Sequence, residues 1–328
     1  MTASVLPADR VLEWVREHYA FADPVECVVL RSELNDVYAV GAGGRRYALR
    51  VGRPGWRSRE DVENEAAAVE HIAAKGVSVA RPVMMRDGTA VGAIDAPGEA
   101  RNTIMFEWLP GDSVGEANVR QCVEIGRLTG EIHRASDDLP AGRLGLSVGA
   151  RWIEEDPGSA IASVVPDPND ADLIRSAVAM GKAVYSGWPK VPPFWGFVHG
   201  DLAEHNILFD QGTLHVFDFE GCGAGWRTDE VIGWLLRQGG RGLADEAWKA
   251  RCEAYLSGYR ETRKLEPFEV DAYRVNAAVS LVAVMDITVR IVPEVPLQPL
   301  LDKFLPRLRQ MSESGFTCNE LISRGVRI

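Results

Sequence analysis

Two short motifs between Phe197 and Asp218 carry side chains suited to phosphoryl transfer. The first is His-Gly-Asp at 199–201, and Asn206 follows its aspartate five residues later. The second is an alternating, strand-like run that ends at Asp218. In phosphoryl transfer a carboxylate accepts the proton of the attacking hydroxyl, while an amide and a second carboxylate hold magnesium on the nucleotide phosphates. Asp201, Asn206 and Asp218 have the side-chain types for these roles, in that order.

Turn and strand signals between the two motifs suggest how these side chains meet. The turn sequence Asp-Gln-Gly at 210–212 separates two apolar runs, 207–209 and 213–217. Two β-favouring runs joined by a short loop that contains glycine are typical of a β-hairpin. The hairpin would bring Asn206 and Asp218 to the same end of the ribbon. The simpler alternative is a hairpin with polar ends and no catalytic role.

The joint pattern resembles the aminoglycoside phosphotransferase and choline kinase family of kinase-like enzymes, in which His-Gly-Asp replaces the His-Arg-Asp of protein kinases. The resemblance implies an α+β, bilobal protein-kinase-like fold. A small antiparallel-sheet lobe would span residues 1–108, and a larger, mostly helical lobe residues 109–328. It also implies that Asp201 is the catalytic residue and that Asn206 and Asp218 are ligands of Mg²⁺.

The resemblance places a nucleotide site in the first part of the chain. Arg50 lies on a β-rich run where the family usually has a Lys that contacts the α and β phosphates. The planar fork of Arg holds phosphate oxygens well, although Arg and Lys are not interchangeable. Glu65, on an expected helix, matches the family glutamate that pairs with this cation. Ser32 and Asn35 lie in a polar loop that would fold over the triphosphate.

A hinge would complete the nucleotide site. The strand expected at 102–108 leads into Leu-Pro-Gly at 109–111. In the family, backbone groups after this strand bind the adenine edge, and apolar side chains flank the faces of the ring. The hinge candidates lie between residues 105 and 109, and those assigned to the site are Met105, Glu107, Trp108 and Leu109. The nucleotide is expected to be ATP, with GTP left open.

Two acidic residues are candidates for binding an amino-bearing acceptor. Glu220 lies close to Asp218, and Asp286 interrupts the apolar run 277–291. A buried carboxylate without a partner costs on the order of several kcal/mol, so Asp286 should be paired or functional. Arg290, four residues further on, offers a structural partner, and this pairing is the simpler interpretation.

Other segments near the motifs leave alternatives open. Asp229 matches a family aspartate that braces the catalytic loop, but an acidic residue in a first helical turn also stabilises the helix dipole. His133 is expected to be a packed structural histidine rather than a catalyst. The glycine-rich segment 221–225 is expected to be a turn, and the segment 139–168 shows the least regular pattern.

The composition is that of an ordinary globular protein. The chain has 328 residues, 46% hydrophobic and 25% charged, which is enough for about two domains with a substantial core. Its net charge of -11 argues against a nucleic-acid surface, which needs clustered Lys and Arg, and suits a cationic substrate. The five cysteines are scattered and form no Cys-x-x-Cys pair, so we expect a reduced cytoplasmic protein with neither disulfides nor a zinc site.

The sequence predicts no membrane role. Asp9, Arg10 and Glu13 lie where a signal peptide would need an apolar block. The most apolar segment, 277–289, is too short to span a bilayer and is interrupted by Asp286. We therefore expect a cytoplasmic monomer or homodimer whose partner is a small-molecule hydroxyl acceptor.

The resemblance implies transfer of the γ-phosphate of ATP, with Mg²⁺, to a hydroxyl of a small, amino-bearing molecule. An aminoglycoside or another antibiotic is favoured, and a homoserine, choline, amino-alcohol or sugar kinase of the same family is the alternative, because fold and motifs do not fix the acceptor. A protein kinase is a weaker interpretation, since Glu220 stands where Asp-Phe-Gly has its glycine and no Ala-Pro-Glu follows. The alternative of another class is a silent nucleotide-binding scaffold, which Arg50 suggests and the presence of Asp201, Asn206 and Asp218 opposes.

Overall fold

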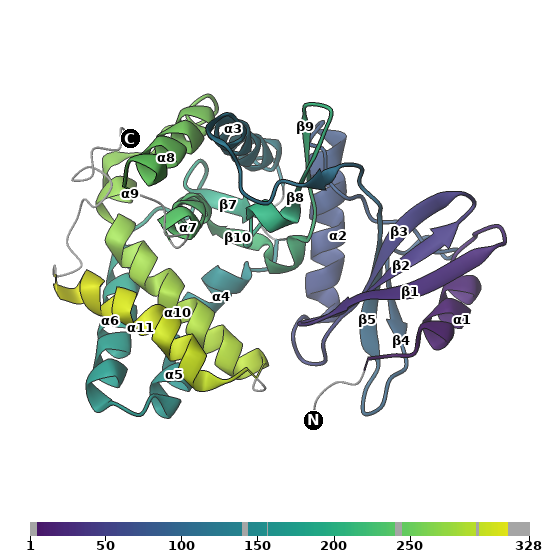
Figure 1. The fold of residues 1–328 in the computed structure, drawn as a ribbon, viewed down its shortest axis with the longest axis horizontal. Coiled ribbons are helices and arrows are strands. Elements are labelled where there is room, and N and C mark those ends of the chain that lie inside the picture. The colour runs from purple at the N-terminus through teal and green to yellow at the C-terminus, as the bar shows by residue number, and fades with distance from the viewer. Residues whose placement is uncertain (1–4, 140–143, 156, 240–244, 293–294, 314–328) are drawn as a thin grey trace. The chain divides into compact units, whose positions relative to one another are not determined.

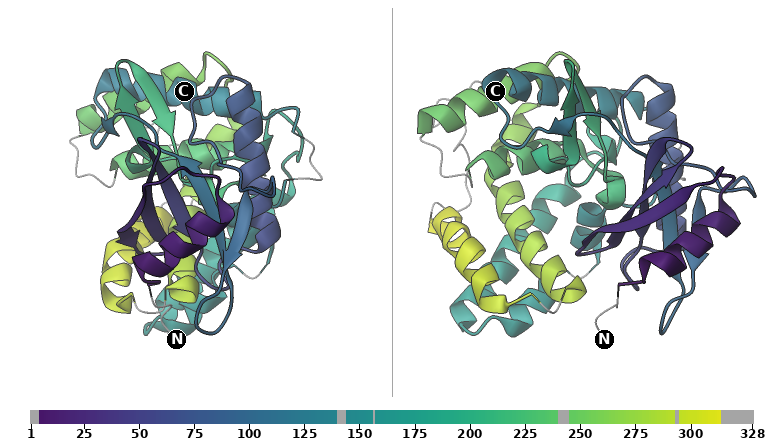
Figure 2. Two further views of the ribbon diagram at one scale, coloured as in Figure 1. Left: turned by 90° about the vertical axis from the view of Figure 1, so that its right-hand side faces the viewer. Right: turned by 45° about the vertical axis from the view of Figure 1, so that its right-hand side comes forward.

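The protein, seen here as a computed structural model, divides into two compact units (Figures 1 and 2). Unit 1 comprises Met1–Asp112 and Leu208–Glu220, and unit 2 comprises Ser113–Ile207 and Gly221–Ile328. Each unit is described by itself. The structure describes residues 5–139, 144–155, 157–239, 245–292 and 295–313.

A five-stranded antiparallel sheet forms the centre of unit 1. Its strands lie in the order β1-β2-β3-β5-β4. They are β1 (Val25–Ser32), β2 (Asp36–Ala42), β3 (Arg45–Val51), β4 (Val91–Ile94) and β5 (Arg101–Glu107). Strands β2 and β3 form a hairpin whose turn lies at Gly43 and Gly44, and their φ angles of 57° and 74° suit glycine.

Helices α1 (Ala8–His18) and α2 (Arg59–Ala74) cover opposite faces of this sheet (Figure 1). On β5, Met105 belongs to the apolar cluster of α1, whereas its neighbour Ile104 packs with Val62 of α2. Successive residues of a strand point to opposite faces, so each helix buries a different face.

The predicted hairpin is present as β8 (Ile207–Asp210) and β9 (Thr213–Val216), which form a sheet of order β6-β8-β9 with the short strand β6 (Asp112–Ser113). Most of this hairpin belongs to unit 1, whereas the boundary expected after residue 108 assigned it to the helical lobe. The reason is a long-range pairing. Val79 forms a parallel bridge with Val216, whose N–H and carbonyl bond to Ser78 and Ala80 at 3.0 Å each.

Unit 2 is mostly helical. Helices α3 (Val119–Ala135) and α8 (Asp245–Tyr259) pack along one another. A second group shares one apolar core and consists of α4 (Val148–Glu154), α5 (Ser159–Val164), α6 (Pro168–Ser186), α10 (Tyr273–Ile291) and α11 (Leu297–Glu313). The remaining elements include α7 (Arg227–Gly239), α9 (Pro267–Asp271) and an antiparallel pair of strands, β7 (Trp195–Val198) and β10 (Gly223–Trp226).

The structure adds regular elements where the sequence showed none. Most of the glycine-rich segment expected as a turn pairs with β7 as strand β10, and the segment of least pattern contains α4 and α5. Across the residues described above, no helix combines the length and the apolarity needed to cross a bilayer.

Asp286 of α10 ties three helices of unit 2 together. Its side chain is fully buried. Its Oδ2 accepts hydrogen bonds from the indole N–H of Trp152 in α4, at 2.9 Å, and from Nε of Arg290, at 2.7 Å. Its Oδ1 accepts the backbone N–H of Ile161 in α5 at 2.8 Å. The pairing with Arg290 is therefore present, and the buried carboxylate is satisfied.

We expect Asp286→Ala to lower the free energy of unfolding by about 3 kcal/mol, because it leaves buried donors without a partner. Urea denaturation measures this loss. Asp302→Ala is the control, since exposed Asp302 on α11 accepts a hydrogen bond from the nearby side chain of Gln298, and its effect should stay within about 0.5 kcal/mol. Equal stabilities of the two variants would contradict a structural role for Asp286.

Candidate active site

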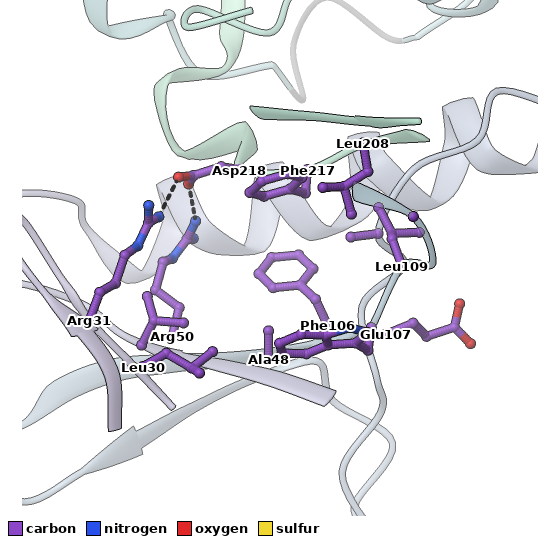
Figure 3. A pocket seen from close by; sticks show the side chains of 14 residues that line it. Leu30, Arg31, Ala48, Arg50, Phe106, Glu107, Leu109, Leu208, Phe217 and Asp218 are labelled. Atoms are coloured by element: carbon purple, nitrogen blue, oxygen red, sulfur yellow. Dashed lines mark hydrogen bonds and ion pairs between the residues drawn. The ribbon is translucent and has the colours of Figure 1, made fainter. Parts of the chain in front are cut away.

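Unit 1 contains a pocket of about 350 Å³ on the face of the sheet that bears Arg50 (Figure 3). Ala48 and Phe106 of the sheet form one apolar wall, and Leu208 and Phe217 form the other. Figure 3 shows Arg31, Arg50 and Asp218 at one end of the pocket, and Glu107 and Leu109 at the other. Such a pocket could hold a flat apolar ring between its walls and an anionic group at its charged end.

The predicted ion pair between Arg50 and Glu65 is confirmed. The guanidinium of Arg50 donates to both carboxylate oxygens of Glu65, at 2.9 and 2.5 Å. Both side chains are buried, with 7% and 1% of their surface exposed. Burial alone would lower the pKa of Arg50, but the charge of Glu65, followed by that of Glu220, raises it above its usual value. The pair therefore joins β3 to α2 and keeps a permanent cation in the pocket wall.

Arg31 was not predicted as a site residue. Its Nη2 donates to Oδ2 of Asp218 at 2.8 Å, while Nη1 of Arg50 lies 3.8 Å from Oδ1 of the same carboxylate (Figure 3). Asp218 itself has a φ of 65°, in the left-handed region that Asp tolerates better than most residues. The sequence contains one signal for Arg31, a cation placed directly before the polar loop.

The side chains of the loop residues Ser32 and Asn35 form hydrogen bonds within unit 1. The hydroxyl of Ser32 donates to Asp36 at 2.6 Å. The amide of Asn35 donates to Oε2 of Glu220 at 2.6 Å, and its oxygen accepts the backbone N–H of Arg53 at 2.9 Å. Burial raises the pKa of Glu220, although Arg50 and Asn35 oppose that shift. Glu220 thus contacts the loop of unit 1, a position that the acceptor interpretation did not anticipate.

The four hinge candidates separate into two groups. Glu107, Trp108 and Leu109 line the pocket, although Figure 3 shows the carboxylate of Glu107 pointing away from the apolar walls. Met105 is a correction: its side chain is fully buried in the core on the α1 side of the sheet. The pleat of β5 places Phe106 on the pocket face instead, opposite Ala48 of β3.

In unit 2, the His-Gly-Asp segment follows β7 and turns sharply at Gly200. Gly200 has a φ of 84°, and a Cβ atom at this position would lie 2.2 Å from the carbonyl oxygen of Gly221. Only glycine fits here. The backbone N–H of Gly200 donates to Oε1 of Glu230 at 2.9 Å, whereas Asp229 accepts the hydroxyl of Tyr185 at 2.8 Å. Glu230 therefore braces the loop, in place of the predicted Asp229.

His133 was predicted to be a packed structural histidine, and its burial and contacts agree with this role. It is 1% exposed, and its Nε2 lies 2.9 Å from Oε2 of Glu230. Its Nδ1 lies 3.0 Å from the hydroxyl oxygen of Tyr259. Burial lowers the pKa of His133, although Glu230 opposes the shift, so a neutral ring with its proton on Nε2 satisfies both contacts. His133 thus orients the carboxylate that holds the loop.

Asp201 and Asn206 lie together at the end of this loop. Asn206 donates through Nδ2 to the backbone oxygen of Asp201 at 2.9 Å, and this nitrogen lies 3.3 Å from Oδ2 of the carboxylate. Nη1 of Arg237 lies 3.3 Å from Oδ1. Desolvation by the surrounding protein would raise the pKa of Asp201, but the nearby imidazole of His205 and the charge of Arg237 lower it overall. The half-exposed carboxylate is therefore ionised at neutral pH and able to accept a hydroxyl proton.

The predicted metal ligands Asn206 and Asp218 each fit that role within their own unit. Because Asn206 donates through its nitrogen, its oxygen is the atom left for a cation. The carboxylate of Asp218 already attracts the guanidinium groups of Arg31 and Arg50. Within the described ranges, no cluster of three or more His, Cys, Asp or Glu side chains could hold a metal alone. Mg²⁺ commonly needs only one or two protein oxygens beside phosphates and water.

The chain is similar in sequence to several known proteins. An uncharacterised protein of Deinococcus radiodurans is 32% identical over 273 residues, which cover 82% of this chain and 78% of that protein. A homoserine kinase of Azorhizobium caulinodans is 32% identical over 211 residues, which cover 62% of this chain and 61% of that protein.

A solved structure of an amicoumacin kinase with AMP-PNP, Ca²⁺ and Ami matches 95% of each chain with a TM-score of 0.80 and 20% identity. This likeness shows that the chain has the α+β, protein-kinase-like fold implied by its motifs. Residues 27–268 match the model of the phosphotransferase enzyme family. Since this match covers more than half of the chain and includes Arg50, Asp201, Asn206 and Asp218, the protein belongs to the phosphotransferase enzyme family.

Proposed function

We propose that this protein transfers the γ-phosphate of ATP to a hydroxyl of a small, amino-bearing molecule. The observation that carries the proposal is the unit 1 pocket, in which two apolar walls lead to Arg31, Arg50 and Asp218. The adenine ring would lie between the walls, near Trp108 and Leu109. The phosphates would extend toward the two arginines, of which Arg50 is held by Glu65.

The reaction depends mainly on placement and charge. Asp201 would orient the acceptor hydroxyl and accept its proton as the acceptor oxygen forms a bond to the γ-phosphorus. The bond between that phosphorus and the bridging oxygen breaks, and ADP leaves. Mg²⁺, when bound by Asn206 and Asp218, would neutralise charge on the phosphate oxygens. Glu230 would keep Asp201 in position, because it holds the neighbouring backbone N–H of Gly200.

The acceptor is proposed to be an antibiotic, and its phosphorylation would provide resistance. The fold similarity to an amicoumacin kinase supports this class. An amino alcohol such as homoserine or choline, or a sugar, is the second candidate, and the likeness to a homoserine kinase supports it. We place the enzyme in the cytoplasm as a monomer or homodimer, with ATP preferred to GTP. The paired cation and the ionised Asp201 oppose a silent scaffold, since nucleotide binding alone does not need a proton acceptor.

We expect Asp201→Ala to lower kcat by roughly 10² to 10⁴, because the variant loses the group that accepts the proton. The assay follows ADP release from MgATP with aminoglycosides, peptide antibiotics, amino alcohols and sugars. Calorimetry with AMP-PNP should show nearly unchanged nucleotide affinity. Asp172→Ala, at an exposed carboxylate on α6 that pairs with Arg175, is the control and should behave as wild type. Near-normal turnover by Asp201→Ala would remove Asp201 from the mechanism.

Arg31 and Arg50 should differ in what their loss affects. Arg31→Met should weaken binding of MgATP by about tenfold, as expected for one lost charged hydrogen bond, and leave stability nearly unchanged, because Arg31 is half exposed. Arg50→Met should weaken binding and also lower the free energy of unfolding by about 3–5 kcal/mol, because Glu65 stays buried without its partner. Calorimetry and urea denaturation separate the two effects. Wild-type nucleotide affinity in both variants would disprove the assigned phosphate site.

A further inference from the structure

A second pocket, of about 210 Å³, lies entirely within unit 2 and has Asp201 in its wall. Residues of α4, β10, α7 and α10 line it. Trp152, Tyr185 and Trp226 contribute aromatic side chains, and the rings of Tyr185 and Trp226 stack with centroids 4.5 Å apart. Val284 of α10 lines the same pocket, and 47% of its surface is exposed. The site of proton acceptance therefore adjoins an apolar, aromatic space.

Two helix glycines keep this space open. A Cβ atom on Gly149 of α4 would meet no atom within 4 Å among the described residues, and one on Gly233 of α7 would meet only the Nη2 atom of Arg237, at 3.8 Å. In contrast, a Cβ atom on Gly225 in the same wall would lie 2.8 Å from Oγ of Ser147. Glycine destabilises a helix interior relative to alanine. Gly233 lies in the interior of α7, where glycine lowers helix stability although close packing does not require it, and this supports a pocket that is kept open for a ligand.

Among the three acidic residues that line the pocket, one carboxylate is available to pair with an amine of a ligand. Glu230 already bonds to Gly200 and His133, and Asp201 lies beside Arg237. The remaining acid is Asp229, whose Oδ1 accepts the hydroxyl of Tyr185 at 2.8 Å. No hydrogen bond reaches its Oδ2 from the residues that the structure describes. Burial raises the pKa of Asp229 to about 7, so a nearby ammonium group would favour its charged form.

We infer that this pocket binds the acceptor, and that the acceptor is an alcohol with a single amine and an apolar, ring-bearing body. The inference rests on the proposed function and narrows its substrate class. The amine pairs with Asp229, the ring packs against Trp152 and Tyr185, and the hydroxyl approaches Asp201. A polycationic aminoglycoside fits poorly, because it would bring several charges to one available carboxylate and to the cation of Arg237.

A set of matched alcohols tests this inference. Phenylalaninol carries the amine and the ring, 3-phenylpropan-1-ol lacks only the amine, alaninol lacks only the ring, and kanamycin is a polycation. With MgATP, we expect kcat/KM for phenylalaninol to exceed the values for the other three at least tenfold. Faster turnover of kanamycin or alaninol than of phenylalaninol would overturn the inference and leave the proposed function standing. Binding of MgAMP-PNP without ADP release on the broad acceptor panel would instead overturn the proposed function.

Variants at Gly233 and Asp229 test the location of the pocket. Gly233→Leu should raise the KM for phenylalaninol at least tenfold while the Kd for MgAMP-PNP stays within twofold, because the nucleotide pocket belongs to unit 1. Gly233→Ala should raise the KM for phenylalaninol less than Gly233→Leu does, and its Tm should be unchanged or higher. This result would show that the larger side chain blocks the pocket and does not unfold the protein. Asp229→Asn should abolish the preference for phenylalaninol over 3-phenylpropan-1-ol.

The matched control is Ala183→Leu, which adds a bulkier side chain at an exposed position of α6 and should change none of these values. An unchanged KM in both Gly233→Leu and Asp229→Asn would place the acceptor elsewhere and overturn the inference.

Discussion

Unit 1 depends on the buried ion pair between Arg50 and Glu65. Removing two charges from water costs on the order of several kcal/mol for each ion, and good geometry must offset that cost. The planar guanidinium meets this condition by donating to both carboxylate oxygens, at 2.9 and 2.5 Å. A Lys at this position would have no fork with which to match the carboxylate. Arg50 therefore joins β3 to α2 and still presents positive charge to Asp218, 3.8 Å away.

Unit 2 also contains a buried carboxylate that holds a neighbouring segment, that of Glu230 in α7. Glu230 is buried, and it accepts hydrogen bonds from the backbone of Gly200 and from His133. The loop can make its sharp turn because Gly200 has no side chain to collide with Gly221. Asp201 stays half exposed at the end of this braced turn, where neighbouring positive charge lowers its pKa. Buried Glu230 thus supports the turn that presents the accessible carboxylate of Asp201.

The two pockets differ in the feature that shapes each of them. In unit 1, strand alternation places Ala48 and Phe106 on the same face of the sheet. The charged side chains of Arg31, Arg50 and Asp218 lie together at one end of the pocket. In unit 2, aromatic side chains and two open helix glycines shape the space beside Asp201. We expect substrate choice to depend on the second arrangement, because the fold alone does not fix the acceptor.

The sequence by itself determined the features that depend on neighbours in the chain. These features are the β8–β9 hairpin, the helix that carries Glu65, and the types and order of Asp201, Asn206 and Asp218. Only the tertiary structure decided that Arg31 contacts Asp218, that Glu230 rather than Asp229 braces Gly200, that Met105 faces the opposite core, and that the 208–220 segment belongs to unit 1. Local backbone preferences act over a few residues, whereas these contacts join positions 30 to 187 residues apart or depend on which face of an element packs against its neighbours.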